Sequence, residues 1–180
     1  MRKYVVGVFG SAAGEVDKDT TVMARTVGSL LAEKDCITLT GGCPGYPYEA
    51  VLGAKEAGGF TVGISPATSR EEHVKHYKFP TEGFDFLVYA GSGKKGRNVV
   101  SLYTADAAIA IAGRIGTLNE LTIAYDEHRP IGILDVPGLA KEFKRLAEGC
   151  GKSGAPIILR SDPRELVNGL LKILNDKKGD

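Results

Sequence analysis

The residues best suited to chemistry lie in a glycine-rich turn at residues 113–117 and one helical turn beyond it. Gly113 and Gly116 would let the backbone approach a phosphate closely, and Thr117 would donate its hydroxyl group to that anion. The positive end of the helix expected there would favour the negative charge. Glu120 follows three residues later, which puts a carboxylate beside the same anion site. Thr117-x-x-Glu120 also matches a capping box, so the glutamate has a purely structural alternative role.

Arg97 is the second candidate for chemistry. It follows the sequence GSGKKG at residues 91–96, at the expected start of a helix, where a cation opposes the helix dipole. One interpretation is an exposed and solvated arginine. The other is that Arg97 meets the anionic group of a ligand, with Lys94 or Lys95 nearby. Arg114 would contribute in the same way from the glycine loop that follows the next strand.

Short apolar runs alternate with amphipathic segments along the chain, and these elements must position the candidate residues. Most of the runs lack polar alternation, as expected of strands covered on both faces. The alternation predicts an α/β fold: one Rossmann-like, doubly wound, nucleotide-binding domain over residues 1–180, with a mainly parallel sheet of about seven strands and helices on both faces. Asp162 is the expected N-cap of the last helix, and residues 175–180 are expected to be a frayed tail. Residues 68–81 lack a clear period and are expected to form a surface excursion, a short helix or a lid. The expected strands are Tyr4–Phe9, Ile37–Thr40, Phe60–Ile64, Phe84–Tyr89, Ala107–Ala112, Ile131–Leu134 and Pro156–Leu159.

Glycine supplies 24 of the 180 residues, about twice the roughly 7% of an average protein. Four glycine clusters directly follow predicted strands and precede helices, at residues 10–14, 41–45, 91–96 and 113–116. The carboxyl ends of parallel strands share one edge of the sheet, where helix N-termini offer free N–H groups. Turns of this kind favour glycine for conformational reasons alone, but four clusters at one edge favour a phosphate-bearing ligand. The residues expected to bind it are Gly10, Ser11, Gly41, Gly42, Gly45, Asn98, Gly113, Arg114, Gly116 and Thr117.

Composition and motifs argue against several classes of protein. A net charge of +1 lacks the basic field that nucleic-acid binding usually needs, and no run approaches the ~20 apolar residues of a membrane span. The first turn, GSAAG, lacks the GxGxxG spacing, and no Walker A loop occurs, so dehydrogenase and P-loop chemistry are not expected. Three cysteines and three histidines form no metal-ligand pattern, so no metal site is expected. The first apolar run is too short for a signal peptide, and we expect a cytoplasmic protein with no membrane partner.

For the other reactive or aromatic side chains, a purely structural role is an alternative to a functional one. Cys43 lies at the proposed binding edge and would be a reactive thiol at a helix start, but the sequence places no partner beside it. His73 and His76 have the i, i+3 spacing of two metal ligands, without a third ligand nearby. Tyr46 and Tyr48 would either stack on a base or pack in the interior.

Four segments of the chain resemble a family of Rossmann-like proteins often labelled "possible lysine decarboxylase". This is the LOG (Lonely Guy) group of cytokinin-activating phosphoribohydrolases, together with the related molybdenum-cofactor carrier proteins. The segments are VFGSA, TGGCPGYPYEA, GRNVVSLYTADAAIAIAG and GRIGTLNE, and the resemblance covers roughly residues 4–160. The family signature PGGxGTxxE is matched at Gly113, Gly116, Thr117 and Glu120. The resemblance implies that Arg97 and Glu120 are catalytic and that the glycine loop with Thr117 holds a 5′-phosphate.

Two departures from the family pattern bear on the function. Ala112 stands where the signature has proline, and Arg114 stands where it has its second glycine. Arg114 would either add a phosphate contact or occlude the loop. The pair Arg97-Asn98 replaces the Arg-Lys that is usual in the hydrolases, and it looks more like the carrier branch. A lysine decarboxylase is not expected, because no lysine stands out as a pyridoxal attachment site.

These features predict a nucleotide-binding protein, with two functions left open. The first is hydrolysis of the N-glycosidic bond of a nucleoside 5′-monophosphate, which gives the base and ribose 5-phosphate. Glu120 would stabilise the positive charge that develops on the ribose ring, and no cofactor would be required. The second is a non-catalytic protein that binds or carries a nucleotide or the molybdenum cofactor, a pterin phosphate. The expected occupant is an AMP-like nucleotide or phosphate, and the resemblance implies a homodimer or higher homo-oligomer.

Overall fold

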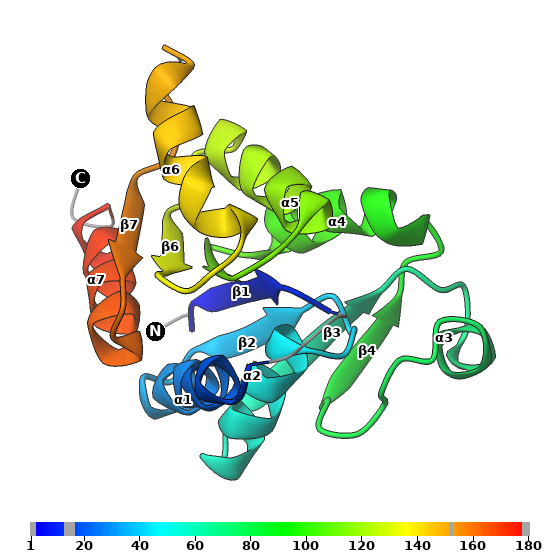
Figure 1. Cartoon of the computed structure of the whole chain (residues 1–180). Coiled ribbons are helices and arrows are strands. Elements are labelled where there is room, and N and C mark those ends of the chain that lie inside the picture. Colours follow the sequence, from blue (N-terminus) through cyan, green and yellow to red (C-terminus); the bar gives the residue numbers. More distant parts are fainter. Residues whose placement is uncertain (1–2, 13–16, 152, 178–180) are drawn as a thin grey trace.

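A computed structural model describes residues 3–12, 17–151 and 153–177 of the chain. Strands and helices alternate along its whole length (Figure 1). The strands are β1 (Val5–Gly10), β2 (Ile37–Thr40), β3 (Phe60–Ser65), β4 (Phe86–Tyr89), β5 (Ala107–Ile111), β6 (Ile131–Leu134) and β7 (Ile157–Arg160). The helices are α1 (Lys18–Glu33), α2 (Tyr46–Glu56), α3 (Arg70–Lys75), α4 (Gly93–Thr104), α5 (Ile115–Asp126), α6 (Leu139–Gly149) and α7 (Pro163–Asp176). Each of the apolar runs predicted to be strands is therefore confirmed, with small shifts of their ends.

The strands form one seven-stranded sheet in the order β4-β3-β2-β1-β5-β6-β7. All neighbouring strands pair in parallel, for example Val8 of β1 with Ile109 of β5. The order reverses between β1 and β5, because the chain first builds outward to β4 and then returns to the other side of β1. Ligands of open α/β sheets bind at such a reversal, at the carboxyl ends of the strands.

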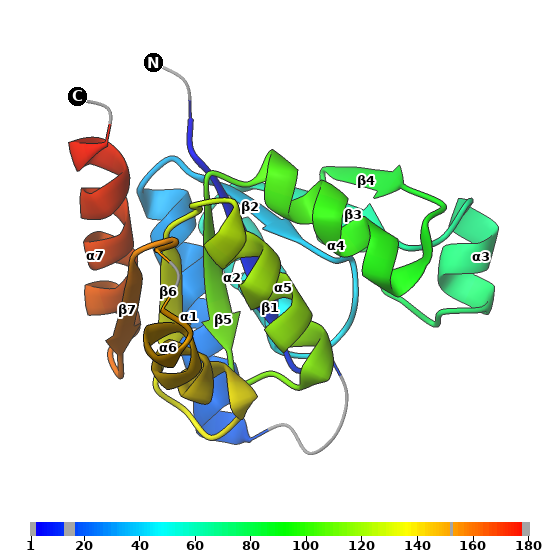
Figure 2. The same cartoon turned by 90° about the horizontal axis from the view of Figure 1, so that it is seen from above.

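Helices cover both faces of the sheet, which confirms the predicted doubly wound α/β fold. Figure 1 shows α1, α2 and α7 on one face and α4, α5 and α6 on the other. Helix α3 lies apart, beyond the edge of the sheet that ends in β4, in both views (Figures 1 and 2). None of the described helices is long and apolar enough to cross a membrane.

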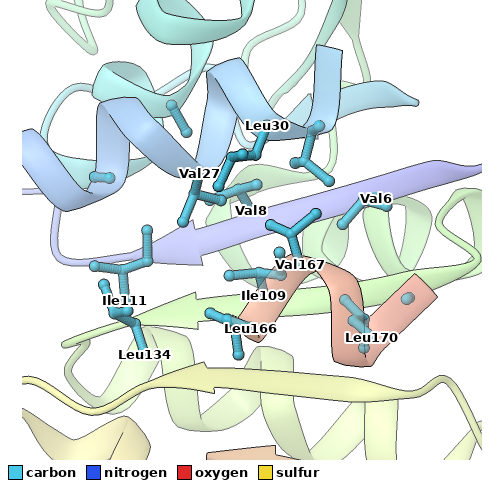
Figure 3. Close-up of a cluster of buried hydrophobic side chains, with 14 of the residues drawn as sticks. Val6, Val8, Val27, Leu30, Ile109, Ile111, Leu134, Leu166, Val167 and Leu170 are labelled. Atoms are coloured by element: carbon cyan, nitrogen blue, oxygen red, sulfur yellow. The ribbon is translucent and has the colours of Figure 1, made fainter. Parts of the chain in front are cut away.

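The two sheet faces build separate cores because successive strand side chains point to opposite faces. Val8 and Ile109 lie in the cluster beneath α1 and α7, with Leu30, Val167 and Leu170 packed over them (Figure 3). The alternate residues of β5 are the small alanines at 108 and 110, which belong to the cluster on the face of α5. A strand of alanines on that face lets α5 pack close to the sheet.

The predicted start of the last helix is confirmed at the level of its hydrogen bonds. The Asp162 carboxylate accepts the backbone N–H groups of Arg164 and Glu165 at 2.7 and 2.9 Å, which caps α7. Helix α7 continues through Asp176, so it includes residues 175 and 176 of the tail that was expected to be frayed. Residues 178–180 of that tail lie outside the described part of the chain.

Candidate ligand-binding site

A cleft of about 510 Å³ opens at the carboxyl edge of the sheet, beside the reversal of strand order. Its size lies in the range of small-molecule pockets. Residues from the turns after β1, β2 and β5, from the first turns of α4 and α5, and from the segment after α3 line it. They are Val8, Phe9, Gly10, Ser11, Ala12, Gly41, Cys43, Pro44, Pro47, Tyr77, Lys78, Phe79, Lys94, Lys95, Arg97, Asn98, Arg114, Gly116, Thr117 and Glu120.

Arg97 and Glu120 meet in the cleft as a buried ion pair. The packing of α4 beside α5 brings Nη1 of Arg97 to 3.1 Å from Oε1 of Glu120. Only 7% of Arg97 and 6% of Glu120 is exposed. The interpretation of Arg97 as a solvated surface cation is therefore wrong. The capping-box alternative for Glu120 is also wrong, because α5 has Arg114 as its N-cap and no side chain caps it.

Gly41 provides the space that the buried arginine needs. A Cβ atom on Gly41 would lie 2.2 Å from the guanidinium atoms of Arg97, a separation that no real contact allows. The Nε atom of Arg97 is buried and has no hydrogen-bond partner. The guanidinium is thus pressed against the chain after β2, with one of its donors unsatisfied. An unsatisfied buried donor is costly, and such costs are concentrated at functional sites.

Burial controls the charge of Glu120. Loss of water raises the pKa of its carboxyl group to about 7, although Arg97 and Lys95 act in the opposite direction. The carboxyl group therefore exchanges its proton near neutral pH. Carboxyl groups that are tuned in this way can serve as general acids or bases.

The cleft is strongly cationic, although the whole chain carries a net charge of only +1. Lys78, Lys94, Lys95, Arg97 and Arg114 line it, against a single acid, Glu120, among the described lining residues. The first turns of α4 and α5 face the same space, and neither helix has a side-chain cap on its first N–H groups. Free N–H groups and the positive end of the dipole both favour an anion. Arg114 is exposed and widens this field rather than filling the loop.

Ser11 joins the two turns at the strand reversal. Its Oγ accepts the backbone N–H of Gly113 at 3.1 Å, which fixes the turn after β1 against the turn after β5. Gly10 is needed there because a Cβ atom would meet the carbonyl oxygen of Ile111 at 2.4 Å. Gly116 differs, since a Cβ atom on it would meet nothing within 4 Å. Its backbone is open to the cleft, as expected of a residue that lets a ligand approach.

The predicted phosphate-binding residues therefore divide into two groups. Those that line the cleft are Gly10, Ser11, Gly41, Asn98, Arg114, Gly116 and Thr117, and their binding of a phosphate stays a prediction. Gly42, Gly45 and Gly113 are not among its described lining residues, and their positive φ angles of 66°, 84° and 90° show that they shape the turns. Asn98 also donates its amide to Oδ1 of Asn119 at 2.8 Å, so it ties α4 to α5.

The remaining candidates are structural. Burial raises the pKa of the Cys43 thiol, which opposes its reactivity. Both ring nitrogens of His73 are hydrogen-bonded inside the protein, and the described residues contain no cluster of three or more potential metal ligands. The hydroxyl group of Tyr46 accepts the N–H of Asp17 at 3.0 Å, and Tyr48 packs on Phe84, so both tyrosines hold the fold together.

The aromatic wall formed by Tyr77 and Phe79 was missed by sequence reasoning. Residues 68–81 were expected to be a surface excursion, a short helix or a lid, and the stretch does contain the short helix α3. Its aromatic residues return to line the cleft. The signal in the sequence was the pair of aromatic residues in an otherwise polar stretch, but the spacing alone does not show that they face the cleft or that His73 bonds to Ser65 at the end of β3.

Comparison with known proteins adds a family and a set of related folds. The SLOG cluster4 family matches residues 3–167 of this chain. An uncharacterized protein from Archaeoglobus fulgidus is 33% identical over 137 residues, which cover 76% of this chain and 83% of that protein. The structure of the molybdenum cofactor binding protein from Rippkaea orientalis has a TM-score of 0.79 and 27% identity, over 97% of this chain and 99% of that one. The Moco carrier protein from Chlamydomonas reinhardtii has a TM-score of 0.79 and 28% identity, over 98% and 99%.

Proposed function

This chain belongs to the SLOG cluster4 family, and from that premise we propose that its cleft binds a phosphate-bearing small molecule of the nucleotide or pterin class. The observation that carries the proposal is the concentration of charge: among the described residues, five cationic side chains and one acid line the cleft of a chain whose net charge is +1. A single-sign field in a concave site raises the local concentration of oppositely charged ligands. The open backbone at Gly116, in the first turn of α5, offers the N–H groups that a phosphate needs.

A role in binding or carrying a ligand fits the resemblance at least as well as catalysis. Two of the similar structures are a molybdenum cofactor binding protein and a Moco carrier protein. The Arg97-Asn98 pair favours the same branch. Such a protein needs a pre-formed cationic cleft but no catalytic carboxylate. We therefore propose a nucleotide- or pterin-phosphate-binding protein of the carrier type.

Calorimetry with ribose 5-phosphate tests this proposal. We expect binding that weakens as salt is raised, because the contacts are electrostatic. Arg114→Ala should weaken it about tenfold or more, since a hydrogen bond to a charged group contributes roughly 1.5–3 kcal/mol. Lys172→Ala is the matched control, because Lys172 is an exposed cation on α7 outside the described cleft lining. Equal effects of the two variants, or no binding to the wild-type protein, would contradict the proposed site.

The natural ligand can be sought in the purified protein itself. The protein is denatured, and the supernatant is analysed by mass spectrometry and, after oxidation, by pterin fluorescence. A pterin phosphate would support the carrier role, and an intact nucleoside monophosphate would support nucleotide binding.

Hydrolysis of a nucleoside 5′-monophosphate is the second candidate function, and the Arg97–Glu120 pair favours it. The carboxylate lies in the cleft with its pKa raised to about 7, and a guanidinium touches it. Breaking an N-glycosidic bond builds positive charge on the ribose ring, which an ionised Glu120 would stabilise. The leaving base takes up the electron pair of the bond and a proton, and water supplies the hydroxyl group that ends on the sugar.

Incubation with AMP and other nucleoside monophosphates, followed by chromatography for free base, tests the hydrolase. Glu120→Gln should abolish release of the base while ribose 5-phosphate still binds. Absence of release by folded wild-type protein would exclude this function for the nucleotides tested and leave the binding proposal standing.

Two further expectations stay predictions. The homo-oligomer implied by the family resemblance is tested by light scattering on the purified protein. The cytoplasmic location is tested by fractionation of cells that produce the full chain.

A further inference from the structure

We propose that Tyr77 and Phe79 form a stacking site for a planar heterocycle, so that the ligand of the cleft is a phosphate joined to a flat ring system. The inference rests on the proposed phosphate site and adds the chemistry of the rest of the ligand. Both aromatic residues are half-buried and line the cleft. Each therefore has part of its ring anchored in the protein and part available to a ligand.

The rings of Tyr77 and Phe79 pack against each other. Their centroids lie 5.4 Å apart with an angle of 43° between the planes. Phe79 also contacts His73 edge to face, with the centroids 5.6 Å apart. Between the two aromatic residues, Lys78 has a φ angle of 56°, a left-handed conformation that a lysine rarely adopts. The strained turn brings the rings together, and strain of this kind is concentrated at ligand sites.

A buried histidine holds this aromatic wall in place. Nε2 of His73 lies 2.9 Å from the carbonyl oxygen of Pro80, so this nitrogen carries the proton and donates it. Nδ1 then accepts the hydroxyl group of Ser65, at the end of β3, at 2.8 Å. The N–H of Phe79 donates to the carbonyl of His73 at 3.1 Å. The segment is thereby fixed to the sheet before any ligand arrives, which reduces the entropy lost on binding.

The aromatic wall and the phosphate site lie at different ends of one cleft. The proposed phosphate site lies at the turns after β1 and β5, whereas the aromatic wall is held by His73 at the end of β3. In the order β3-β2-β1-β5, the strands β3 and β5 are three spacings apart, which is roughly 14 Å. Figure 2 shows α3, the helix that precedes Tyr77 in the chain, well away from the N-terminus of α5. A phosphate alone would occupy one end only.

Lys94 places a cation beside the aromatic wall within the cleft. It comes from the first turn of α4, and its Nζ lies 5.9 Å from the centroid of the Tyr77 ring. A cation beside an aromatic face suits a ligand that carries both an anion and a π system. Aromatic walls stack on bases and similar rings without demanding one hydrogen-bond pattern. The site therefore selects for a flat ring and leaves the choice among such rings to other contacts.

The test compares AMP with ribose 5-phosphate in calorimetric titrations of the full chain. Ribose 5-phosphate has a hydroxyl group at the carbon where AMP carries its adenine base. Tyr77→Ala should weaken AMP binding about 5- to 150-fold, the range expected for the loss of one base-stacking contact. The affinity for ribose 5-phosphate should stay within about twofold. Tyr77→Phe should bind AMP as the wild-type protein does, because phenylalanine keeps the aromatic ring. Phe86→Ala is the control, since Phe86 is an exposed aromatic residue of β4 outside the described cleft lining.

Phe79→Leu provides a second variant if Tyr77→Ala unfolds, because leucine keeps apolar packing on His73 while removing the ring. Unchanged AMP affinity in the folded variants would overturn the stacking site and leave the phosphate site intact. Equal weakening of AMP and ribose 5-phosphate would also overturn it, since the wall would then only support the cleft. Failure of the wild-type protein to bind either probe would overturn the phosphate site, and the stacking site with it.

Discussion

Replacing Glu120 by glutamine should make the protein more stable at pH 8 but not at pH 5. Burial raises the pKa of this carboxyl group from an ordinary 4.5 to about 7 in the folded protein. The folded state therefore holds a proton that the unfolded chain has released. A group of this kind contributes stability below pH 4.5, and that stability is lost as the pH rises through 7.

The magnitude follows from the pKa. Raising it from 4.5 to about 7 corresponds to about 3 kcal/mol of unfolding free energy, of which most is lost between pH 5 and pH 8. Glutamine has the same shape, accepts the Arg97 hydrogen bond and never ionises. The variant should match the wild-type protein at pH 5 and exceed it at pH 8 by about 2–3 kcal/mol, or roughly 4–12 °C in Tm.

Thermal unfolding of both proteins at half-unit steps of pH measures the effect. The other ionisable groups are the same in both proteins, so their contributions cancel in the difference between the two curves. Glu148→Gln is the control, because Glu148 is an exposed glutamate on α6. Parallel curves for the wild-type protein and Glu120→Gln would refute the reasoning, because the carboxyl group would then be ionised throughout and Arg97 would compensate fully for its burial.

Two other predictions test the construction of the site. Gly41→Ala should displace the Arg97 guanidinium and cost about 1–3 kcal/mol of unfolding free energy, measured by denaturant titration. Gly116→Ala should leave Tm unchanged or raised and should weaken ribose 5-phosphate binding, measured by calorimetry. Similar losses of stability in the two variants would contradict the different roles assigned to the two glycines. In the folded protein at pH 8, iodoacetamide should label the exposed Cys150 and spare Cys43, because burial raises the pKa of the Cys43 thiol. Peptide mass spectrometry measures the labelling of each cysteine, and faster labelling of Cys43 would contradict the prediction.

Local patterns in the sequence were enough to predict the fold. The parallel strands were recognisable because a strand buried on both faces is an uninterrupted apolar run, and this property belongs to the run itself. The cap at Asp162 was equally readable, since its partners are the N–H groups of residues 164 and 165. The glycine clusters marked the edge of the sheet at which the cleft opens, because the carboxyl ends of parallel strands must share an edge.

The sequence could not predict what Arg97 and Glu120 do to each other. They are 23 residues apart, and their contact depends on how α4 packs beside α5. Spacing alone suggested a capping box, because Thr117-x-x-Glu120 is a local pattern and the arginine is not part of it. The glycines posed the same difficulty: Gly41 is required by the guanidinium of Arg97, whereas Gly116 faces open space, and no local pattern distinguishes them.

The sequence by itself therefore determined the α/β architecture and the edge of the sheet at which the cleft opens, and it singled out nine of the residues that line the cleft. Only the tertiary structure decided that Arg97 and Glu120 form a buried pair, that burial raises the pKa of Glu120 to about 7 and that Tyr77 and Phe79 line the cleft. The physical reason is the separation along the chain between the residues that interact. Strands, caps and turns are set by neighbours along the chain, whereas burial and the pKa of a carboxyl group depend on atoms that folding brings from distant residues.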